Sequence, residues 1–89
     1  MDEILQLFKL NIGISSCAKD ELYETRIKAV IEEFDRQGIT INEYATDDQM
    51  LVADYAAWEH RKLDTGEDLP KNIERRILRR KTRARCGNA

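Results

Sequence analysis

Residues 46–66 read TDDQMLVADYAAWEHRKLDTG, a run whose apolar side chains recur at helical spacing. They fall on three stripes of a helix: Leu51, Tyr55 and Trp58; Met50, Ala53 and Ala57; and Val52, Ala56 and Leu63. A helix that is apolar over so much of its circumference is expected to be buried and contacted from several sides. One polar stripe remains, formed by Asp47, Asp54 and Arg61. The pattern predicts a central helix over residues 47–64.

Both ends of this predicted helix carry recognisable signals. Thr46 is a candidate N-cap, and Gln49 three residues later completes a capping-box pattern. Asp47 and Asp48 place negative charge where the helix dipole is positive. Gly66 is expected to end the helix, because glycine readily adopts the left-handed conformation of a C-terminal cap.

The spacing of apolar residues predicts three further helices, at about 2–12, 18–37 and 70–83. The first two stop at glycine followed by isoleucine, Gly13-Ile14 and Gly38-Ile39, which is the sequence pattern of a Schellman motif. Pro70 suits the first turn of the last helix, where a missing N–H costs nothing. We therefore expect an all-α fold, a small compact bundle of about four helices that ends in a basic helix.

The predicted core comes from the central helix and from the amphipathic helix before it. Its members are Ile27, Val30, Ile31, Phe34, Leu51, Tyr55 and Trp58. Tyr55 and Trp58 have a second interpretation as inter-subunit contacts, because aromatic residues also concentrate at interfaces. Residues 39–45 are expected to be extended, with Ile39, Ile41 and Tyr44 available to fill the core.

The net charge of −2 hides a strong split along the chain. Residues 1–69 hold 16 acidic and 7 basic residues, a net charge of −9, whereas residues 70–89 hold 1 acidic and 8 basic residues, a net charge of +7. At 89 residues the chain is expected to form one domain, with an acidic core in 1–69 and a basic helix and tail in 70–89. The basic segment is expected to meet something acidic: nucleic acid, a neighbouring subunit, or the body itself.

The residues that usually carry catalysis or bind metals are scarce. His60 is the only histidine, which removes paired-histidine metal sites, and it is expected to be a surface or partly packed residue. Cys17 and Cys86 are too few and too far apart for a zinc site or a redox pair. All four glycines are isolated, so there is no phosphate-binding loop. We expect no enzyme activity, no metal and no cofactor.

The sequence also indicates where in the cell the protein is expected. The longest apolar run, Met50–Ala53, is far shorter than the roughly 18 residues of a membrane span, so no membrane partner is expected. The opening Met1-Asp2-Glu3 is acidic, unlike the basic start of a signal peptide, which favours the cytosol.

The basic C-terminal helix is the one feature that points to a function. Its cations are Arg75, Arg76, Arg79, Arg80, Lys81 and Arg83. They form either a solvated face, partly neutralised by the body, or an electrostatic docking element for a protein surface or nucleic acid. Residues 70–89 contain no aromatic residue, so a contact with nucleic acid would be to backbone phosphate and without sequence preference.

The chain resembles the small head-tail connector proteins of tailed bacteriophages and prophages, also called head-completion or DNA-packaging proteins. The likeness lies in residues 18–21 (AKDE), in 48–52 (DQMLV) followed by 55–58 (YAAW) and 61–62 (RK), and in the sequence Thr65-Gly66 to Leu69-Pro70 before a final basic helix. It spans roughly residues 4–83. The C-terminal residues 85–89 match nothing in that family's pattern.

The resemblance implies a structural protein whose subunits form a homo-oligomeric ring under the portal protein. Such a ring extends the DNA channel, lets DNA pass without sequence specificity, and receives the tail-side connector proteins. It would assemble in the host cytoplasm and then reside at the head-tail junction of the virion. The alternative is a small helical regulator or adaptor that binds the nucleic-acid backbone through the arginine-rich helix.

Overall fold

The computed structural model describes the backbone of residues 2–87 and the side chains of residues 2–82. It contains four helices, in the order α1 (Asp2–Ile12), α2 (Asp20–Arg36), α3 (Thr46–Thr65) and α4 (Lys71–Gly87). No strand occurs between residues 2 and 87, so the predicted all-α bundle of four helices is confirmed.

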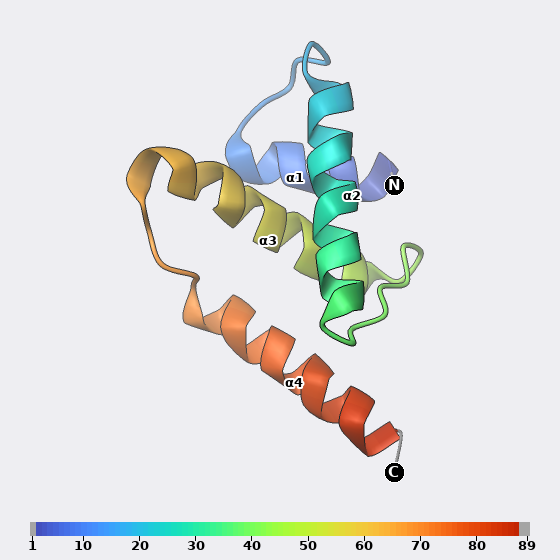
Figure 1. Ribbon diagram of the computed structural model, residues 1–89. Helices are drawn as coiled ribbons and strands as arrows, with labels where there is room; N and C mark the ends of the chain where they lie inside the picture. Colours follow the sequence, from blue (N-terminus) through green and yellow to red (C-terminus); the bar gives the residue numbers. More distant parts are fainter. Residues whose placement is uncertain (1, 88–89) are drawn as a thin grey trace.

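The third helix lies at the centre of the molecule. Its backbone comes close to that of each of the other three helices, whereas the backbone of α4 comes close to that of α3 only. Figure 1 shows α1 and α4 on opposite sides of α3, with α2 passing in front of α1 and of the N-terminal end of α3. A partly buried ion pair between Lys9 Nζ and Asp20 Oδ1, at 2.9 Å, also links α1 to α2. The predicted role of the central helix is confirmed.

Two of the helices end in the predicted Schellman motifs. At the end of α2, the Gly38 N–H donates to the Asp35 carbonyl at 3.0 Å, and the Ile39 N–H donates to the Phe34 carbonyl at 2.8 Å. The equivalent pair of hydrogen bonds closes α1 at Gly13-Ile14. The positive φ of Gly38, 85°, is the left-handed conformation that this motif requires.

The predicted capping box at the start of the central helix is wrong. Thr46 is already the first residue of α3, and no side chain caps the helix. The side chains expected to cap it, or to favour the dipole, bind the preceding loop instead. Gln49 Nε2 donates to the Glu43 carbonyl at 2.7 Å, and Asp48 Oδ2 accepts from the Asn42 N–H at 2.7 Å. These two bonds fix the direction in which the chain enters α3.

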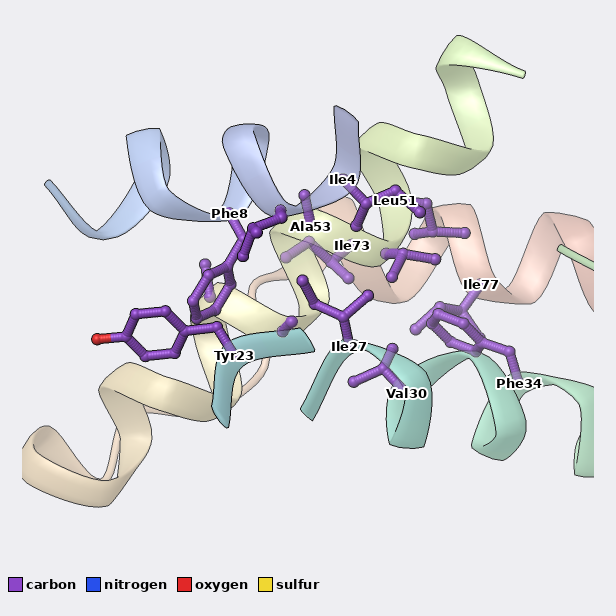
Figure 2. Packing of buried hydrophobic residues seen from close by; sticks show 14 of the residues in the cluster. Ile4, Phe8, Tyr23, Ile27, Val30, Phe34, Leu51, Ala53, Ile73 and Ile77 are labelled. Carbon is purple, nitrogen blue, oxygen red and sulfur yellow. The ribbon is translucent and has the colours of Figure 1, made fainter. Parts of the chain in front are cut away.

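The core lies where α1, α2 and α3 meet, as Figure 2 shows. Of the predicted core, Ile27, Val30, Phe34 and Leu51 are at most 4% exposed. Trp58 is buried at the edge of this cluster, and Ile31 and Tyr55 are half-buried against it. The largest omission is α1, whose Ile4 and Phe8 are fully buried but are absent from the predicted core.

The segment before α3 contributes less to the core than predicted. Ile39 is buried and Ile41 is half-buried, but Tyr44 is 93% exposed, so its predicted place in the core is wrong. The Tyr44 N–H donates to the Asn42 side-chain oxygen at 3.0 Å, in a turn that carries the aromatic ring away from the bundle.

Candidate docking interface

The basic helix α4 has two faces with different surroundings. Ile73 and Ile77 are buried and join the core cluster, so they define an inner face. On the opposite side of the helix lie Arg75 and Leu78, both exposed, with exposed Arg79 on its flank. The apolar stripe therefore attaches α4 to the body while it leaves an outer face uncovered.

Two arginines of the inner face bind carboxylates of α3. Arg76 Nη1 lies 2.8 Å from Asp54 Oδ2, and Arg80 Nη1 forms a short ion pair with Asp48 Oδ1. The residue number falls along α3 as it rises along α4, so the two helices run antiparallel. The Asp48 and Arg80 side chains are 10% and 19% exposed, and charge pairs are screened little at that depth.

Each of these carboxylates also binds a third part of the chain. Asp54 Oδ1 accepts from Asn11 Nδ2 at 3.1 Å, so this one side chain links α1, α3 and α4. Asp48 joins Arg80 to the backbone of Asn42, in the loop that precedes α3. Arg76 and Arg80 thus belong to a network of polar contacts that also includes α1, α3 and the loop before α3.

The turn between α3 and α4 is held by Trp58. Its indole Nε1 donates to the Glu67 carbonyl at 3.1 Å, and Lys62 Nζ lies 4.4 Å from the centre of its ring. Arg61 Nε binds the Glu67 carboxylate at 3.0 Å, and the Tyr55 ring packs 5.3 Å from the indole. These contacts fold residues 66–70 back over α3 and thereby set where α4 begins.

The six cations predicted as docking residues therefore separate into three groups. Arg76 and Arg80 form ion pairs with carboxylates of the body. Arg75 and Arg79 are exposed, and Lys81 is half-buried; none of the three forms an ion pair with another described side chain. Arg83 lies outside the residues whose side chains are described.

The sequence indicates in part which cations of α4 pair with the body and which stay exposed. Asp54 lies on the one polar stripe of an otherwise apolar helix, and such a residue calls for a partner. Asp48 gave no such signal, because the helix dipole already explained an acidic residue in the first turn. The antiparallel pairing that joins it to Arg80 depends on the turn at Trp58.

His60 lies in a cluster of aromatic rings. Its ring is 5.9 Å from that of Phe8 and 6.0 Å from that of Tyr23, both in edge-on geometry. Its Nδ1 is buried and has no hydrogen-bond partner among the described residues. The partly packed position predicted for His60 is confirmed, and within residues 2–82 no group of three potential metal ligands occurs.

Comparisons with known protein families, curated proteins and solved structures found no match to this chain. Within the described residues, no helix is both long enough and apolar enough to cross a membrane. The phage connector function stays a prediction.

Proposed function

We propose that this protein is a structural subunit of a phage or prophage head-tail connector, which forms a ring under the portal and extends the DNA channel. The observation that carries the proposal is the uncovered outer face of α4, where Leu78 is 54% exposed beside exposed Arg75 and Arg79. The inner face already holds α4 on the body through Arg76 and Arg80. A fixed helix that presents apolar surface and positive charge suits docking on another acidic subunit.

The body provides such an acidic surface. Its net charge is −9, and the inner arginines neutralise only Asp48 and Asp54 of that excess. A contact between two different patches on identical subunits repeats from copy to copy, and it closes into a ring when the rotation permits. We further propose that this ring binds the portal protein and the tail-side connector proteins, and that DNA passes through it without sequence specificity.

Mass photometry of the purified protein at low and high salt tests this function. We expect closed oligomers of ring size at low salt and their dissociation as salt rises, because exposed charges are screened beyond about 10 Å at 0.1 M ionic strength. A monomer at all salt and protein concentrations would contradict the proposal. If that monomer also bound duplex DNA without sequence preference, the alternative of a small helical regulator or adaptor would replace it.

A further inference from the structure

A groove of about 430 Å³ runs along the C-terminal half of α2, beside the segment that leads to α3. It is lined by Ile31, Glu32, Asp35, Arg36, Thr40 and Ile41. The two isoleucines are half-buried and give it apolar walls. Among residues 71–82, the part of α4 whose side chains the structure describes, none lines the groove.

The groove carries unbalanced negative charge. Glu32 and Asp35 are exposed, and neither forms an ion pair with another described residue. Arg36 does not compensate them, because its guanidinium binds Glu33, with Nη2 at 2.8 Å and Nε at 3.1 Å. Hydrogen bonds from Gln37 and Arg36 hold the pKa of the Glu33 carboxyl below its usual value, which keeps that pair ionised.

The outer face of α4 has the complementary composition. Lys71, Arg75, Leu78 and Thr82 follow one another at intervals of four, three and four residues, so they share one stripe of the helix. All four are exposed, and Leu78 is the one large apolar side chain among them. An exposed leucine with Arg75 one turn before it and Arg79 next to it in the chain matches a groove with isoleucine walls and two unpaired carboxylates.

We propose that the outer face of α4 from one copy of this chain docks in the α2 groove of a second copy, with Leu78 between Ile31 and Ile41 and with Arg75 and Arg79 near Glu32 and Asp35. The inference rests on the proposed function and specifies its repeating contact. Helix and groove are different patches, so each copy offers one of each and the contact propagates. Within one molecule the pairing is blocked, because the Asp54 and Asp48 ion pairs hold the opposite face of α4 on α3.

Charge reversal in the groove tests this pairing. The groove variant carries Glu32→Lys and Asp35→Lys, and the helix variant carries Arg75→Glu and Arg79→Glu. We expect each variant alone to lose the oligomer over the range in which the wild type assembles, because like charges then face each other. Mixing the two variants is expected to restore assembly, since the basic groove accepts the acidic helix and the remaining helix and groove still match.

The control variant carries Asp64→Lys and Asp68→Lys, which change the net charge equally at exposed positions outside the groove. We expect it to assemble as the wild type does, and thermal melts of all variants check that they fold. Oligomers of the groove variant at wild-type concentration, or no recovery on mixing, would overturn the pairing but leave the connector function standing. A wild type that never oligomerises would overturn both.

Discussion

Replacement of Trp58 by alanine is expected to lower the free energy of unfolding by about 3–5 kcal/mol, the usual cost of truncating a large buried aromatic side chain. The side chain is only 9% exposed, and its loss also removes the hydrogen bond to the Glu67 carbonyl. A domain of this size has a total stability of about 5–15 kcal/mol, so a large fraction would be lost. The melting temperature should fall by more than about 10 °C.

One further variant separates the hydrogen bond of Trp58 from its apolar packing, and a second variant is a control at an exposed aromatic residue. Trp58→Phe keeps most of the apolar bulk but removes the N–H donor, so we expect a smaller loss, of about 1 kcal/mol from the hydrogen bond. Tyr44→Ala removes a ring that is 93% exposed and should change stability by less than about 0.5 kcal/mol. If the melting temperature of Trp58→Ala were as close to that of the wild type as the melting temperature of Tyr44→Ala, the contacts of Trp58 with the α3–α4 turn would contribute nothing to stability.

Replacement of Asp48 by alanine is the second large effect that we expect, with a loss of about 2–4 kcal/mol. Removal of one partner from a fully buried ion pair costs about 3–5 kcal/mol, and Arg80 keeps some access to water. The variant leaves the arginine without a counter-charge, and it also deprives the Asn42 N–H of its acceptor. Chemical denaturation followed by circular dichroism measures the change.

The neighbouring residue gives a matched control. Asp47 carries the same charge in the same turn of α3 but is exposed, so Asp47→Ala loses only its interaction with the helix dipole, about 0.3–1 kcal/mol. In an Asp48→Leu, Arg80→Met double variant the buried charges are both gone, and stability should return most of the way to wild type. Equal losses for Asp47→Ala and Asp48→Ala would mean that the Arg80 pair contributes nothing to holding α4.

The helices were predictable because their signals are local. Apolar spacing and the two Gly-Ile stops are read within a few residues, and they place α1, α2 and α3 to within about two residues. The Thr46 capping box failed for a physical reason: Gln49 and Asp48 found backbone partners in the preceding loop, six residues away in the chain. A local sequence pattern indicates which hydrogen bonds are possible, and the conformation of the preceding loop determines which of them form.

The candidate interface was only half predictable. The sequence indicates a dense row of cations on α4, but not which of them face the body. That division depends on the turn held by Trp58, which sets the antiparallel register of Arg76 with Asp54 and of Arg80 with Asp48. The groove on α2 could not be predicted from the sequence, because it forms only where Thr40 and Ile41 lie beside the helix.

We propose that α4 has an inner face that stabilises the fold and an outer face that docks. Two double variants with the same charge change test it: Arg76→Gln with Arg80→Gln on the inner face, and Arg75→Gln with Arg79→Gln on the outer face. The measurement is mass photometry across a salt series, with a thermal melt of each variant beside it.

We predict that the inner variant melts well below the wild type. We also predict that the outer variant melts with the wild type but no longer forms oligomers, as high salt alone would achieve. An outer variant that assembles as the wild type does at every salt concentration would show that Arg75 and Arg79 are only solvated charges and that the outer face of α4 does not dock.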